Sequence, residues 1–175
     1  MKATGIVRRI DDLGRVVIPK EIRRTMRIRE GTPLEIYTGV GGEVIFKKYS
    51  PVGELSAFAE DYAEALAKGS SLTAAICDED TVIAAAGPLK KELIGKDISD
   101  GVRNIIKERT KYAGGGGIVA VDESGLSVAV AYPIISCGDV SGAVMLIDKD
   151  GKPASEADIK LVLAACEFLG RQLED

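Results

Sequence analysis

The chain has 175 residues and 46% hydrophobic content, so it can bury a core as one domain or as a small module attached to a larger one. The absence of histidine excludes Ser-His-Asp triads and Cys-His dyads, and three widely spaced cysteines predict neither structural zinc nor a disulfide framework. Residues 1–50 carry eleven Lys and Arg against six Asp and Glu, whereas residues 51–175 carry twelve against twenty-one, which predicts a polyanion-binding segment joined to an acidic remainder.

Residues 1–50 are predicted to form a first domain of two hairpins separated by a short helix. Alternating or β-branched apolar residues predict strands at residues 5–10, 15–18, 34–37 and 44–46. A helix is expected from Lys20 to Arg27, because Pro19 is suited to the first turn of a helix. So few apolar positions give a marginal core, and we therefore expect two copies to interleave their strands in an obligate dimer.

The remaining residues predict a second domain of the α+β class, in which helices pack on an antiparallel sheet. Proline and glycine residues indicate a linker over residues 51–55 that leads into the first helix of a domain spanning residues 56–175. Strands are predicted at residues 72–77, 81–86, 118–121, 126–135 and 140–148. Helical apolar stripes are present at residues 52–66, 102–109 and 159–173, with Ser99 and Ser155 as expected N-caps. We expect the first and last helices to pair on the sheet and to join a helical bundle with another subunit.

The run LGRVVIPKEIRR at residues 13–24 closely resembles the AbrB family of bacterial transition-state regulators, and the resemblance extends from Thr4 to Tyr49. The element order of the second domain, together with the segment GPLKKELIG at residues 87–95, resembles a GAF domain. These resemblances imply a swapped-hairpin AbrB-type β-barrel dimer in the first domain and an α+β GAF-like fold in the second. They also imply a transcriptional regulator, an activator or a repressor, of sporulation-type gene expression.

The AbrB resemblance further implies where the dimer contacts double-stranded DNA. The residues at the family's DNA-contacting positions are Arg8, Arg15, Arg23 and Arg24, with Arg9 and Lys2 as neighbours. Guanidinium groups bind phosphates in a bidentate manner and reach guanine edges in the major groove. No long recognition helix is visible in the sequence, so we expect DNA to be read largely through its shape and deformability. For Lys20 and Arg27, DNA contact and salt bridges on the helix surface both remain open.

Two roles remain open for the second domain, a pocket for a small effector and a surface for assembly. GAF domains often bind small molecules between the sheet and the loops that cover it. The run Gly114–Gly117 lacks the GKS/T ending of a phosphate cradle and predicts a mobile loop, which favours the pocket. The apolar stripes of the first and last helices favour assembly into a homotetramer. Neither a cofactor nor a metal is expected, since Asp148–Gly151 lacks the further ligands of a calcium loop and predicts a turn.

The sequence thus predicts a DNA-binding regulator without catalytic residues. The alternative is an antitoxin, because some antitoxins share the swapped-hairpin domain, although they usually join it to a short disordered tail. An enzyme in residues 51–175 is disfavoured by the lack of histidine and of paired carboxylates. Without a signal-peptide pattern or an apolar run of roughly 18 to 20 residues, we expect a cytoplasmic protein with no membrane partner. Cys77 and Cys166 are expected in the core and Cys137 at the surface.

Overall fold

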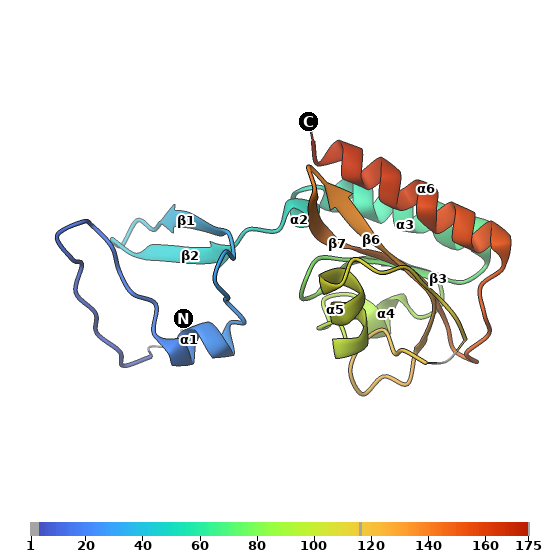
Figure 1. Ribbon diagram of the computed structural model, residues 1–175, viewed down its shortest axis with the longest axis horizontal. Helices are drawn as coiled ribbons and strands as arrows, with labels where there is room; N and C mark the ends of the chain where they lie inside the picture. The colour runs from blue at the N-terminus through green and yellow to red at the C-terminus, as the bar shows by residue number, and fades with distance from the viewer. Residues whose placement is uncertain (1–3, 116, 175) are drawn as a thin grey trace. The chain divides into compact units, whose positions relative to one another are not determined.

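A computed structural model describes residues 4–115 and 117–174 (Figure 1). The chain forms two compact units that divide between Tyr49 and Ser50, and we call the first unit the head and the second the body. Among the described residues, no helix is both long and apolar enough to cross a membrane.

The head contains one short helix and one two-stranded antiparallel sheet. Helix α1 spans Lys20–Thr25, and strands β1 (Leu34–Thr38) and β2 (Val44–Lys48) pair with each other along their whole lengths. The predicted second hairpin is therefore confirmed. The helix ends before the predicted residue, Arg27, because Arg27 adopts a positive φ of 53° that lies outside the helical range.

The predicted first hairpin is wrong for the single chain. Residues 5–10 and 15–18 form no strand, and only the hydrogen-bonded turn between them is present. A single head offers these residues no partner strand, and their apolar side chains stay in solvent: Val7 is 84% exposed and Leu13 is 70% exposed. Among the described residues of the head only Pro19 is buried, so one copy has no hydrophobic core of its own.

The body is built on a five-stranded antiparallel sheet in the order β4-β3-β7-β6-β5. Its strands are β3 (Thr73–Cys77), β4 (Val82–Ala86), β5 (Tyr112–Ala113), β6 (Ser127–Ser136) and β7 (Asp139–Asp148). The strand predicted at residues 118–121 is wrong, since that segment makes only isolated bridges. Its backbone hydrogen bonds are divided between two neighbours, because Ala120 bonds both to Ser99 and to Leu126.

The sheet edge along β6 is only partly covered. Strand β7 pairs with β6 over nearly its whole length, whereas β5 pairs only with Val130 and Ala131. Pro133 lies in the part of β6 beyond these pairs. Since proline has no N–H to donate, this stretch of edge cannot offer a complete hydrogen-bond ladder to an added strand.

Helices cover both faces of the sheet, with α3 and α6 on one face and α4 and α5 on the other (Figure 1). They are α2 (Pro51–Glu54), α3 (Ser56–Ser70), α4 (Lys90–Leu93), α5 (Asp100–Lys107) and α6 (Glu156–Gln172). Both predicted N-caps are confirmed: Ser99 accepts the N–H of Val102 at 3.2 Å, and Ser155 forms a capping box with Asp158. Residues 51–54, predicted within the linker, instead form α2, and the helix predicted from residue 52 is interrupted at Leu55.

The sheet separates two hydrophobic cores, because successive side chains of a strand point to opposite faces. In β7, Leu146 joins the core under α3 and α6, whereas Met145 joins the core under α4 and α5. The predicted core cysteines are confirmed, with Cys166 in the first core and Cys77 in the second, and burial raises the pKa of each thiol to about 12. Apolar side chains thus fill the space between the sheet and the helices α4 and α5.

Candidate DNA-binding surface

The described arginines at the AbrB-type positions are all exposed, and they lie in three parts of the head. They are Arg8 and Arg9 before the turn at residues 11–14, Arg15 after it, and Arg23 and Arg24 in the last turn of α1. Lys2, the remaining predicted position, lies outside the described residues. A basic last turn also suits the helix itself, because the carbonyl end of a helix carries partial negative charge.

Arg15 is held by the turn that precedes it. One carboxylate oxygen of Asp11 accepts the backbone N–H groups of Leu13 and Arg15 at 3.0 and 2.8 Å, and the other accepts Nε of Arg15 at 2.8 Å. The hydrogen bonds from the Arg15 backbone and side chain lower the pKa of Asp11 below its ordinary value. A guanidinium has five N–H donors and this contact uses one of them, so the turn orients Arg15 while leaving it able to bind an anion.

Arg23 joins α1 to the extended segment that follows this turn. Its Nε donates to the carbonyl of Ile18 at 3.2 Å, so Arg15 and Arg23 lie at opposite ends of the segment 15–18. The guanidinium of Arg8 donates to the neighbouring carbonyl of Val7 at 3.2 Å. Among the described residues, neither Arg8 nor Arg9 bonds to the segment 15–18, so the single chain brings together only part of the predicted surface.

Two further cationic side chains of the head have informative surroundings. Lys47 on β2 places its ammonium 4.7 Å from the ring centre of Tyr37 on β1, in a cation–π contact. Arg27, which the sequence leaves undecided, is exposed and has the positive φ described above. The sequence pattern gives no signal for this conformation, because it places Arg27 within the predicted helix, whereas glycine is the residue usual at such a position.

Several exposed apolar side chains of the body lie along α3 and α6. Phe58 is 52% exposed, Phe168 40% and Leu163 37%. Tyr62 of α3 stacks on Phe168 of α6 with ring centres 5.2 Å apart, so aromatic contacts join the two helices as well as the sheet beneath them. The predicted pairing of the first and last helices on the sheet is therefore confirmed.

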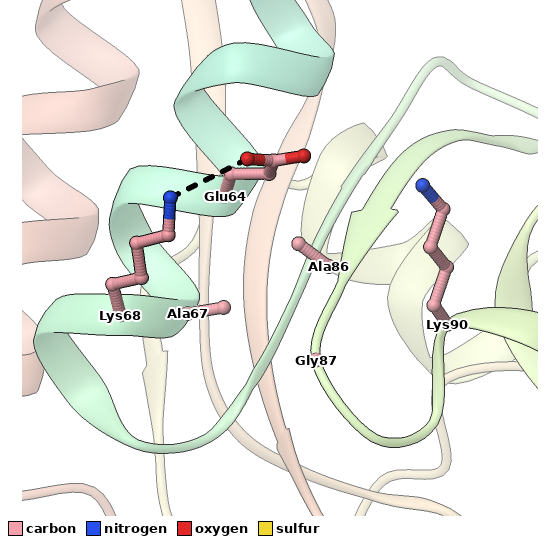
Figure 2. Close-up of a pocket in the computed structure, with 6 residues that line it drawn as sticks. All are labelled: Glu64, Ala67, Lys68, Ala86, Gly87 and Lys90. Carbon is pink, nitrogen blue, oxygen red and sulfur yellow. Dashed lines mark hydrogen bonds and ion pairs between the residues drawn. The ribbon is translucent and has the colours of Figure 1, made fainter.

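An open pocket of about 340 Å³ lies between α3 and the turn after β4 (Figure 2). Its lining residues are Glu64, Ala67, Lys68, Ala86, Gly87 and Lys90. Figure 2 shows Lys68 paired with Glu64 on the helix, at 3.5 Å, and Lys90 across the pocket from them. Gly87 is required in the turn, because its φ is +113° and an added Cβ would lie 2.9 Å from the Cα of Thr73.

Gly115 and Gly117 of the glycine run, and the acidic turn of the body, have structural explanations, whereas Gly116 lies outside the described residues. A Cβ on Gly115 would lie 2.8 Å from the carbonyl oxygen of Gly151, and the N–H of Gly117 donates to the hydroxyl of Tyr112 at 3.3 Å. The predicted turn at Asp148 is confirmed, since its carboxylate accepts the N–H of Lys152 at 2.7 Å. Among the described residues, no group of three or more potential ligand side chains is arranged to hold a metal ion.

Two family models match the chain. One, described as stage V sporulation protein T C-terminal, transcription factor, matches residues 54–174, and the other, described as antidote-toxin recognition MazE, bacterial antitoxin, matches residues 7–53. The stage V sporulation protein T of Bacillus subtilis (strain 168) is 48% identical over 179 aligned positions, which cover 99% of each chain. The likeness to an antitoxin is thus confined to the head and its junction with the body.

Each domain also resembles a different known protein or domain. The transition state regulatory protein AbrB of Bacillus subtilis (strain 168) is 59% identical over 51 residues, which cover 29% of this chain and 52% of that protein. The GAF domain of Acinetobacter phosphoenolpyruvate-protein phosphotransferase matches 68% of this chain and 81% of that one, with 15% identity and a TM-score of 0.57. The head is an AbrB-type DNA-recognition domain and the body has a GAF-like α+β fold, as predicted. The chain belongs to the family of the transcription factor stage V sporulation protein T.

Proposed function

We propose that two chains pair through their heads and that arginines of both chains contact one DNA duplex, as the basis of transcriptional control during sporulation. One contrast within the head carries this proposal. Among its described residues the head buries only Pro19, whereas every described arginine at an AbrB-type position is exposed. A two-stranded sheet with one short helix is marginally stable in water, so pairing with a second copy is the physical route to a folded DNA-binding unit.

Residues 5–10 and 15–18 are the part of the head that pairing would order. Their alternation predicts strands, and a partner chain would supply the ladder that a single chain lacks. In that arrangement Val16 points to the face opposite Arg15, because neighbouring residues of a strand alternate. Val16 is 42% exposed in the single chain, so pairing of the two copies can bury it further.

Hydrogen exchange on the full chain tests this pairing. Peptides that cover residues 5–18 should exchange slowly in the wild type, because their amides would be bonded in the dimer. Val16→Asp should abolish that protection and weaken DNA binding. Val40→Asp is the matched control, since Val40 is fully exposed at the turn between β1 and β2 and should tolerate the charge. Rapid exchange in the wild type, or equal protection in both variants, would contradict the paired head.

The salt dependence of DNA affinity tests the role of the arginines. If about eight side chains of a dimer touch phosphates, the slope of log K against log salt should be near −7, and a slope shallower than about −3 would contradict such a surface. Replacing one of the proposed arginines by glutamine removes two charges from the dimer and should make the slope shallower by about 2. Arg171→Gln changes an exposed arginine of α6 in the body and should leave the slope unchanged.

For the body, we propose assembly of two dimers into a tetramer through α3 and α6. The exposed aromatic side chains along these helices favour burial against a second copy, because contiguous exposed apolar surface often marks an interface. Light scattering on Phe58→Glu should give a dimer where the wild type gives a tetramer. Val119→Glu places the same charge at a half-exposed apolar residue outside these helices and should leave the assembly intact. A tetrameric Phe58→Glu would contradict the proposal.

Effector sensing is the second candidate role of the body, and the open pocket beside Gly87 is the observation that favours it. Lys90 lines the pocket across from the ion pair of Lys68 with Glu64, so the lining keeps a net positive charge, which favours a small anion. A ligand that binds only the folded chain raises its Tm in proportion to the logarithm of its concentration. A panel of small anionic metabolites should therefore contain a compound that raises the Tm of the wild type and not of Lys90→Ala. A panel without effect on the wild type would count against this role.

A further inference from the structure

Arg27 occupies a backbone position that usually belongs to glycine. It follows α1 with a φ of 53°; its own N–H bonds to the carbonyl of Arg24 at 3.3 Å, and the N–H of Ile28 bonds to the carbonyl of Arg23 at 2.8 Å. These two bonds define a Schellman motif, whose left-handed residue is most often glycine. Any side chain with a Cβ strains the backbone there, so arginine at this position weakens the free head relative to glycine.

The motif also places Arg27 beside the proposed DNA-contacting residues of α1. The chain folds back onto the carbonyls of Arg23 and Arg24, and the side chains of all three arginines are exposed. The end of α1 therefore presents three guanidinium groups where the AbrB-type positions account for two. Stabilisation of the helix terminus by a cation is the competing explanation, and it requires only a positive charge and no DNA.

We propose that Arg27 is a further DNA-contacting residue, whose guanidinium binds a phosphate next to those bound from Arg23 and Arg24. The backbone strain at Arg27 is then tolerated because it places this guanidinium at the end of α1. Functional residues often hold uncommon backbone conformations. The inference rests on the proposed function of the head, and it adds one phosphate contact per chain, or two per dimer.

The chain supplies a matched control in the body. Arg109 follows α5 with the same φ of 53°, and the N–H of Thr110 bonds to the carbonyl of Ile105 at 3.1 Å, so it closes a second Schellman motif. Arg109 lies in the body, outside the proposed DNA-binding surface, and its guanidinium lies 4.0 Å from the carboxylate of Asp139. Replacing either arginine by glycine relieves the same backbone strain, but only the change at Arg27 should affect DNA.

The experiment compares the full chain with Arg27→Gly, Arg27→Lys and Arg109→Gly. The probe is a DNA duplex recovered from a random-sequence pool by selection with the wild type, and its affinity is measured between about 50 and 200 mM salt. Arg27→Gly should raise the Tm by roughly 2–4 °C and make the slope of log K against log salt shallower by about 2. Arg27→Lys should keep the wild-type slope because it keeps the charge, and Arg109→Gly should keep it as well.

The outcomes separate this inference from the proposed function of the head. An unchanged slope in Arg27→Gly, together with a shallower slope in Arg23→Gln, would overturn the role of Arg27 alone. Unchanged slopes in both variants would instead overturn the DNA contacts proposed for the head as a whole. A lower Tm in Arg27→Gly would also overturn the inference, because the arginine would then be retained for the stability of the fold.

Discussion

Two helical glycines of the body, Gly69 and Gly170, lie close to different kinds of neighbouring atom. Substitutions at the two positions together test how closely α6 packs on the sheet. A Cβ added to Gly170 in α6 would lie 2.4 Å from the carbonyl oxygen of Ile135 in β6, whereas a Cβ added to Gly69 in α3 would lie 3.3 Å from a methyl group of Leu161. The methyl group can move by rotation of its side chain. The carbonyl belongs to the backbone of the sheet, so α6 itself would have to shift.

The expected free energies of unfolding follow from these contacts. Gly170→Ala should cost about 1–3 kcal/mol through overpacking, against a gain of up to about 1 kcal/mol from the helix propensity of alanine. Gly69→Ala should keep most of that gain, because its close contact is with a flexible side chain. The two variants should therefore differ in stability, with Gly170→Ala the weaker.

Thermal unfolding of the full chain, followed by circular dichroism, measures this difference. At about 2–4 °C per kcal/mol, the Tm of Gly170→Ala should lie roughly 2–12 °C below that of Gly69→Ala. Light scattering on both variants controls for a change in assembly, which would alter the Tm by mass action. Equal midpoints, or a higher midpoint for Gly170→Ala, would refute the inference that α6 rests directly on the Ile135 carbonyl.

Native thiol labelling near neutral pH should modify Cys137 rapidly and the other two cysteines only after unfolding, because burial raises the pKa of Cys77 and Cys166 to about 12. Rapid labelling of all three would show that the two cores open readily. The Asp11 carboxyl should titrate below its ordinary value of 3.8, because hydrogen bonds from Arg15 lower its pKa. Its stabilisation of the turn is then present above the unfolded-state pKa and is lost as the pH falls through the lower folded-state value. A titration of Asp11 by NMR at or above 3.8 would contradict the contact, and Asp11→Asn should remove the pH dependence.

The sequence predicts those elements of the body whose patterns are long and local. The capping residues Ser99 and Ser155 precede helices of more than two turns, and the apolar runs of β6 and β7 are long enough to identify. Helix α4 and strand β5 are missed because elements of four and two residues carry no periodicity. They form because neighbouring segments hold them, as when β5 pairs with Val130 and Ala131.

The head shows a different limit of sequence-based prediction. The AbrB resemblance over residues 4–49 supplies the candidate arginines, and the small number of apolar residues predicts that one copy is insufficient. Strand propensity at residues 5–10 and 15–18 describes a local preference, whereas a strand also needs a neighbouring strand to pair with, and the single chain places none beside these residues. The conformation of Arg27 is equally hidden from periodicity, because it depends on where the chain folds back onto the end of α1.

Pro133 limits the ways in which copies of this protein can associate. Association by adding strands to a free sheet edge has no natural end point and produces fibres, whereas pairing through matching helical faces closes after a fixed number of copies. A proline in the uncovered stretch of β6 makes the open-ended route unfavourable there. Such a restriction suits a DNA-binding regulator. The occupancy of a DNA site then depends on the concentration of closed oligomers and does not depend on how far the protein has polymerised.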